Sequence, residues 1–139
     1  MGWLARRQQR SLRSAEARIE ETCLSKYDAA VQSCLKDWQE VIGKHPEEDA
    51  EMFIFMGHNV CWAQAVRESA IMLKNPSLGA YLGALPPYRG NADGQYVEDS
   101  AALTHLSPHF GADRVRRALA RGERDEFGVG ERPSAFDFR

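Results

Sequence analysis

The chain of 139 residues has little of the features that mark several common classes of protein. Its three cysteines are too few to hold together a disulfide-rich secreted scaffold. Eighteen Lys and Arg face twenty Asp and Glu, so the basic excess typical of nucleic-acid-binding proteins is missing and we expect no nucleic-acid partner. The sequence contains neither a G-x-S-x-G nucleophile elbow nor a glycine-rich phosphate loop followed by Lys and Ser or Thr. We therefore predict a protein that is not an enzyme, without catalytic residues, cofactor or bound metal.

A long hydrophobic run is also missing. The best candidate for a membrane span is the segment 52–66, fifteen residues without a full charge. At 1.5 Å per residue it would reach about 22 Å, which is short of a hydrocarbon core about 30 Å thick. The segment also contains His58, Asn59 and Gln64. We expect a buried helix in a soluble or peripheral protein.

The N-terminal segment has a skewed charge. Through residue 18 it holds five arginines and a single acid, Glu16, for a net charge of +4. An Arg-rich, acid-poor segment with serines is typical of a mitochondrial or plastid transit peptide, and the alternative is a basic surface helix or arm. We predict a basic arm over residues 1–10. Trp3 has no core to enter there, so we expect it to contact a partner, or an anionic membrane surface together with the arginines.

Residues 11–75 have the pattern of two helices. In the first, over 11–43, a heptad seam consists of Leu24, Tyr27, Val31, Cys34, Trp38 and Val41. Gly43 suits the end of that helix, and Pro46 suits the first position of a second helix that ends before Pro76. No run of β-branched residues alternates with period two. The sequence therefore predicts a mostly α protein built on a long antiparallel helical hairpin.

The second helix is apolar over most of its circumference, which one neighbouring helix cannot cover. Either the C-terminal third of the chain folds back over it, or a partner protein covers it. We take Phe53, Phe55 and Trp62 as candidate interface residues.

Residues 76–139 contain five of the six prolines and eight of the eleven glycines. This composition predicts an irregular extension with short helices over 95–106 and 113–121, the second ended by Gly122. Pro108 disfavours helix at Ser107. The remaining candidate interface residues are Arg114, Arg117, Phe127, Phe136 and Phe138. The arginines have an alternative, which is pairing with the nearby acids Glu123, Asp125 and Glu126.

Two cysteines lie at equal chain distance from the predicted turn of the hairpin. Cys34 and Cys61 can therefore meet, and a disulfide between them would join the two helices. The alternative is that all three cysteines are small buried hydrophobic residues. His58 and Cys61 are three residues apart and share a helix face, so with Cys34 they offer three metal ligands, although a structural zinc site needs four.

These observations predict a non-catalytic accessory, or supernumerary, structural subunit of a large multiprotein assembly. We favour an organellar membrane complex, such as a respiratory or photosynthetic one, since a basic N-terminus and a single disulfide both fit an organelle. A mitochondrion is preferred to a plastid, with the protein peripheral to the membrane and other protein subunits as its partners. The alternative is a self-contained helical domain that binds a small ligand or a metal through His58, Cys61 and Cys34.

Overall fold

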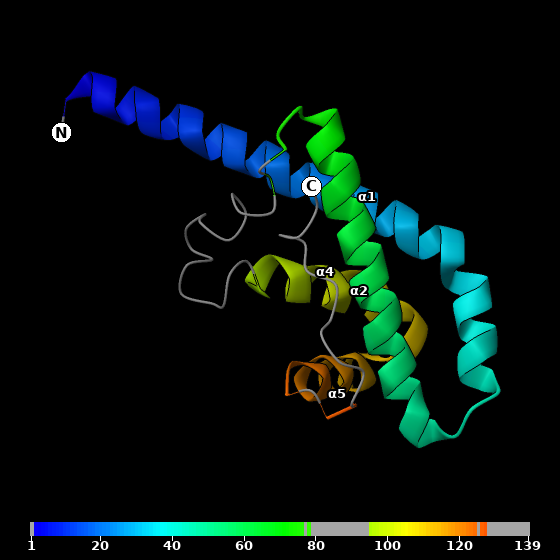
Figure 1. The fold of residues 1–139 in the computed structure, drawn as a ribbon. Helices are drawn as coiled ribbons and strands as arrows, with labels where there is room; N and C mark the ends of the chain where they lie inside the picture. Colours follow the sequence, from blue (N-terminus) through cyan, green and yellow to red (C-terminus); the bar gives the residue numbers. More distant parts are fainter. Residues whose placement is uncertain (1, 77, 79–94, 125, 128–139) are drawn as a thin grey trace.

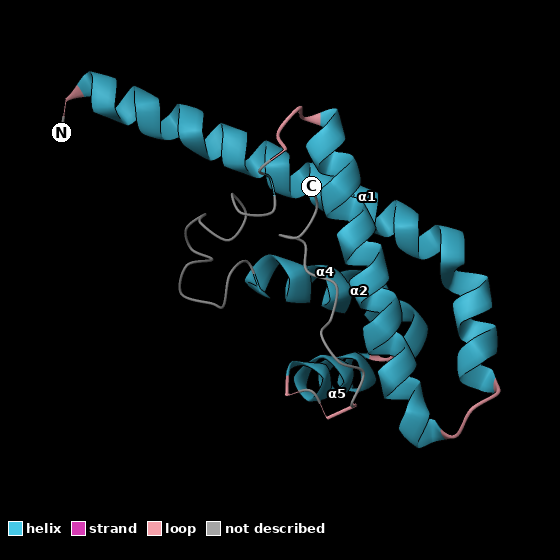
Figure 2. Ribbon diagram, in the orientation of Figure 1, coloured by secondary structure: helices cyan, strands magenta, loops and turns pink. Residues whose placement is uncertain are grey.

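The computed structural model describes residues 2–76, 78, 95–124, 126 and 127, and these residues form four helices and no strand. The helices are α1 (Trp3–Gly43), α2 (Glu47–Met72), α4 (Gln95–Phe110) and α5 (Ala112–Glu123), as Figures 1 and 2 show. The mostly α class predicted from the sequence is confirmed. Of the predicted C-terminal extension, 79–94 and 128–139 lie outside the described residues, and with them Phe136 and Phe138.

Helix α1 begins at Trp3, eight residues before the position expected from the sequence. No proline or glycine interrupts residues 3–18, and Arg, Gln, Ala and Leu, which favour helix, make up most of them. The basic segment 1–10 is therefore largely the first turns of α1 rather than a separate arm. These turns project beyond the other helices (Figure 1).

Helices α1 and α2 form the expected antiparallel pair, joined by a short turn at 44–46. Trp38 fixes their spacing near this turn. Its indole Nε1 donates a hydrogen bond to the carbonyl oxygen of Phe53 over 3.0 Å. A Cβ atom at Gly57 would lie 2.5 Å from the Trp38 ring, so only glycine lets α2 approach this closely.

The C-terminal helices fold back over the hairpin, with α5 packed against α2 and α4 packed against α1. Helix α5 is strongly amphipathic, and it buries Val115, Ala118 and Leu119 toward the core. A Cβ atom at Gly122 would lie 2.3 Å from the nearest carbon of the Phe55 ring. Only glycine therefore lets α5 pack directly on this ring. Of the two ways to cover the apolar second helix, the chain itself therefore provides one.

Helix α4 extends four residues beyond the predicted end at 106 and contains Pro108. The proline lies in the last turn, where only one intrahelical hydrogen bond is lost with its missing N–H. Gly111 follows with φ of +91°, a backbone conformation that favours glycine, and separates α4 from α5. The break between the two helices therefore falls four residues later in the chain than predicted.

Candidate functional site

A buried chain of hydrogen bonds connects three helices at the centre of the molecule. The hydroxyl of Tyr27 in α1 lies 2.9 Å from Nδ1 of His58 in α2. Nε2 of the same ring lies 3.1 Å from Oε1 of Glu98 in α4. Tyr27 and His58 are fully buried and Glu98 is nearly so. These three hydrogen-bonded side chains form a polar cluster inside the described core, which we call the Tyr-His-Glu chain.

The protonation of the Tyr-His-Glu chain follows from its surroundings. Burial, and then the negative charge of groups such as the Glu98 carboxylate, raise the pKa of Tyr27 well above its ordinary value. The phenol therefore stays protonated and can donate to Nδ1 of His58, and an Nε2–H of the same ring can then donate to the carboxylate. The order of groups is that of a proton relay, but all three are enclosed by the core. Its effect in this fold is to hold α1, α2 and α4 in register.

His58 was also the centre of the alternative metal site. Both of its ring nitrogens are hydrogen-bonded to protein groups, so binding an ion would first require breaking one of these bonds. Within the part of the chain that the structure describes, no three His, Cys, Asp or Glu side chains gather as ligands for a metal. The geometry therefore gives no support to a metal site at His58, Cys61 and Cys34.

The cysteine pair lies on the facing sides of α1 and α2. The Sγ atoms of Cys34 and Cys61 are 3.6 Å apart, and both residues are free thiols. Cys34 is half-buried, whereas Cys61 and the third cysteine, Cys23, are buried. The spacing argument is thus correct that the hairpin brings these two residues together. Their disulfide stays a prediction.

The arginines of α5 pair with acids at the start of α2. Both Arg117 and Arg121 donate to the carboxylate of Glu51, over 2.8 and 2.6 Å. Arg114 forms an ion pair with the exposed Glu47. Burial alone would raise the pKa of Glu51, but the hydrogen bonds from the two guanidinium groups outweigh it and lower the pKa. These predicted interface residues, Arg114 and Arg117, therefore connect two helices of the same chain.

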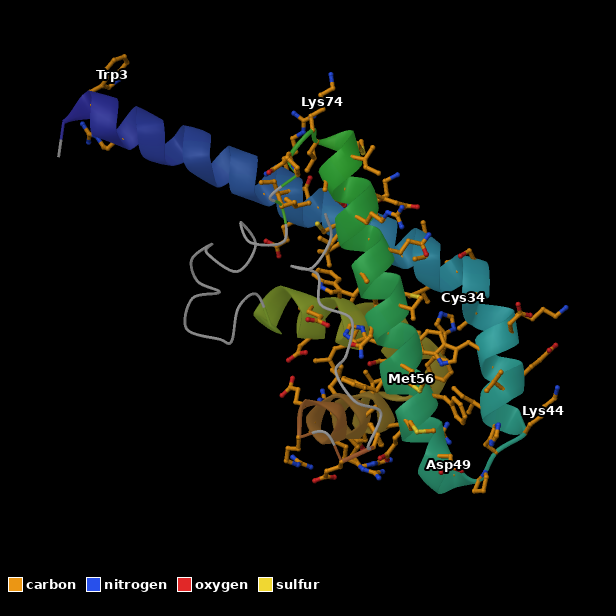
Figure 3. The ribbon with its side chains drawn as sticks, in the orientation of Figure 1. Trp3, Cys34, Lys44, Asp49, Met56 and Lys74 are labelled. Atoms are coloured by element: carbon orange, nitrogen blue, oxygen red, sulfur yellow. The ribbon has the colours of Figure 1, made fainter. Side chains whose placement is uncertain are left out.

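The outer face of α2 points away from the core. We define this face by Met56, Val60, Gln64, Arg67 and Ile71, which follow one another at steps of three or four residues. All five are exposed, and the three apolar side chains are exposed by 42%, 60% and 72%. Met72 extends the apolar surface at the end of the helix. Figure 3 labels Met56 on α2.

The predicted aromatic interface residues divide into two groups. Phe55 and Trp62 lie in the core of this chain, where Trp62 packs edge-on against Tyr27. Phe53 and Phe127 are half-buried. Trp3 is exposed by 59%, at the projecting end of α1 in Figure 3. Of these aromatic residues, Trp3 is thus the most exposed.

Sequence reasoning did not identify the two partners of His58. Tyr27 was assigned only to the apolar seam of the first helix, and Glu98 lies at the start of a helix that the sequence defined weakly. The available signal was a tyrosine in the seam of the first helix and a histidine in the apolar second helix, each of which needs a hydrogen-bond partner when buried.

The sequence matches no known protein-family model, no curated protein and no solved structure. Among the described helices, none is both long and apolar enough to cross a membrane.

Proposed function

We propose that this protein is a non-catalytic accessory subunit of a large multiprotein assembly, which it joins through the outer face of α2. The observation that carries this proposal is the run of Met56, Val60 and Ile71 on that face, all exposed in a helix whose opposite side is buried. Of the five residues that define the face, only Arg67 carries a full charge. An exposed helix face with three large apolar side chains among its five residues favours association with another protein.

The shape of the face indicates what kind of surface would cover it. From residue 56 to 71 it follows a straight run of helix about 22 Å long, at 1.5 Å per residue. A second helix with its own apolar stripe matches such a ridge by packing its side chains into the grooves. The partner is therefore a helix of another subunit.

The projecting turns of α1 offer a second contact. Their net charge through residue 18 is +4, and Trp3 stands exposed at their end. Arginines attract the anionic headgroups of a membrane, and tryptophan favours the interface between headgroups and acyl chains. This combination supports a protein bound at the periphery of a membrane.

The same features motivate the expected location. An Arg-rich, acid-poor N-terminus is typical of chains sent to organelles, and we place the assembly in an organelle, in a mitochondrion before a plastid. A respiratory or photosynthetic membrane complex is the assembly we favour.

The docking proposal is tested by adding charge to the outer face in cells that produce the chain. In the double variant Val60→Glu, Ile71→Glu, two carboxylates would have to be buried against the partner helix. We expect the unaltered protein to comigrate with a large particle of the organelle membrane in native gels of a mild detergent extract. The double variant should migrate as the free chain.

The matched control is the double variant Gln32→Glu, Gln39→Glu, which adds the same charge at exposed positions of α1. It should stay in the large particle. A wild-type chain that migrates free, or a double α2 variant that remains in the particle, would contradict the proposal.

Membrane contact is tested separately with purified protein and vesicles. We expect the protein to sediment with vesicles that contain phosphatidylserine, to remain in solution with pure phosphatidylcholine, and to be released by high salt. Replacing Arg6, Arg7, Arg10 and Arg13 with glutamine should abolish sedimentation. Equal binding to neutral vesicles would contradict this role for the arginines.

A further inference from the structure

The cysteine pair has a geometry that goes beyond simple packing. Cys34 and Cys61 come from different helices and are 27 positions apart in sequence, yet their sulfur atoms lie 3.6 Å from each other. Each sulfur is thus the nearest thiol to the other, and bond formation requires an approach of about 1.5 Å, to the 2.05 Å of a disulfide. Cys23 lies on the same helix as Cys34, eleven residues and about three turns away.

The two thiols differ in their access to solvent. Cys34 is half-buried and lies on the α1 side of the hairpin, where Figure 3 labels it. Cys61 is enclosed in the core, with 2% of its surface exposed. An oxidant in solution therefore reaches Cys34 first, and Cys61 is placed to react with whatever has become attached to Cys34.

We propose that Cys34 and Cys61 form a thiol oxidation site, at which Cys34 is modified by a low-molecular-weight disulfide such as glutathione disulfide and Cys61 resolves the adduct. This site is independent of the docking face and does not require the proposed function.

The reaction is balanced as two thiol–disulfide exchanges. The thiolate of Cys34 attacks one sulfur of glutathione disulfide, a new S–S bond forms, and one glutathione thiolate leaves. The thiolate of Cys61 then attacks Sγ of Cys34, and the second glutathione leaves. Two protein thiols are oxidised, one glutathione disulfide is reduced, and the two leaving thiolates take up the two protons that the cysteines lose.

The product would join the middle of α1 to the middle of α2. A disulfide stabilises mainly by restricting the unfolded chain, and the loop closed here is 27 residues long. For a chain of this length we expect the oxidised form to melt roughly 5 to 15 °C higher than the reduced form.

The test uses the reduced full-length protein and glutathione disulfide. After timed incubation, the free thiols are alkylated under denaturing conditions and the products are mapped by non-reducing mass spectrometry. We expect a cross-link between Cys34 and Cys61, and alkylation of Cys23. The melting temperature should rise with the cross-linked fraction.

Single variants separate the two steps. Cys61→Ala should retain one glutathione on Cys34, whereas Cys34→Ala should take up none at Cys61. Cys23→Ala is the matched control and should behave as the wild type. Circular dichroism confirms that each variant is folded.

The dependence on pH gives a further readout. Burial, and then the neighbouring Cys34, raise the pKa of Cys61 to about 12. Resolution of the adduct should therefore accelerate about tenfold per pH unit between pH 7 and 9, as the thiolate fraction grows. Glutathione on Cys23, equal reactivity of Cys34→Ala and wild type, or a stable adduct on Cys34 in the wild type would overturn the proposal.

Discussion

The two faces of α2 are made of similar residues but have different surroundings. The inner face places Phe55, His58 and Trp62 against α1, α4 and α5, and all three are buried. The outer face places Met56, Val60 and Ile71 in solvent. Because apolar residues occur on both sides, the helix has almost no amphipathic asymmetry. One face of this helix is therefore buried within its own chain, and the other face stays exposed.

The comparison is sharpest at two neighbouring positions. Phe55→Ala removes a ring that supports α5 and contacts Phe127, and we expect it to lower the free energy of unfolding by about 3–5 kcal/mol. Met56→Ala should change it by less than about 1 kcal/mol, because this side chain is 42% exposed. Chemical denaturation followed by circular dichroism measures both. Equal losses would show that the two faces do not differ as described.

The polar part of the inner face gives the next largest effect. His58→Leu removes a donor from Glu98 and the acceptor of Tyr27, and we expect a loss of about 2–4 kcal/mol. Combined with Tyr27→Phe, the loss should be smaller than the sum of the single losses by about 0.5–3 kcal/mol, because the two groups share a hydrogen bond. The exposed His109→Leu is the control, with a change within about 0.5 kcal/mol. Strict additivity would contradict the Tyr-His-Glu chain.

The ion pairs between α5 and the start of α2 should contribute less. Glu51→Gln should cost about 1 kcal/mol at pH 7, since Arg117 and Arg121 are partly exposed and their attraction is screened by solvent. The native pKa of Glu51 is lowered from 4.5, so its contribution is present above pH 4.5 and is lost as the pH falls through the lower native value. The stability difference between wild type and variant should therefore vanish in acid. The control Glu40→Gln, at an exposed position of α1, should show no such dependence on pH. A stability difference between wild type and Glu51→Gln that grows in acid would contradict a lowered pKa of Glu51.

The outer face should show the smallest change in stability. Val60→Glu adds a charge to a side chain that is 60% exposed, and we expect the free energy of unfolding to change by less than about 0.5 kcal/mol. This result would allow any loss of association in cells to be attributed to the face rather than to misfolding. A loss above about 2 kcal/mol would show that the face is buried in the folded monomer.

Much of the architecture was predictable because local rules fix it. The heptad spacing of α1, Pro46 before α2 and the turn between them gave the hairpin, and the pairing of Cys34 with Cys61 followed from chain distance alone. The start of α1 and the end of α4 were less accurate. At the end of α4 the proline was tolerated, since one proline in a last turn removes a single hydrogen bond. At the start of α1 the basic segment consists of residues that favour helix, so the helix continues through it.

The candidate site residues were also only partly predictable from the sequence. Residue type indicated which side chains carry large apolar or charged groups, and Trp3 is exposed by 59% at the start of α1. It did not indicate which surface each group faces. Arg117 was expected to pair with acids nearby in sequence or with a partner, but its carboxylate partner Glu51 is 66 residues away. Such contacts depend on how α5 is placed on α2.

The amino-acid sequence by itself determined that this protein is helical, that two long segments pair as a hairpin and that its N-terminus is basic. Hydrophobic period, turn residues and charge are local properties, so they can be recognised without knowing what lies beside them. Only the tertiary structure decided which side of α2 is covered, that Tyr27, His58 and Glu98 meet, and that Val60 and Ile71 remain in solvent. Burial depends on contacts between residues far apart in the chain. Because α1 and α5 pack on one side of the evenly apolar α2, that side is buried and the other side is exposed.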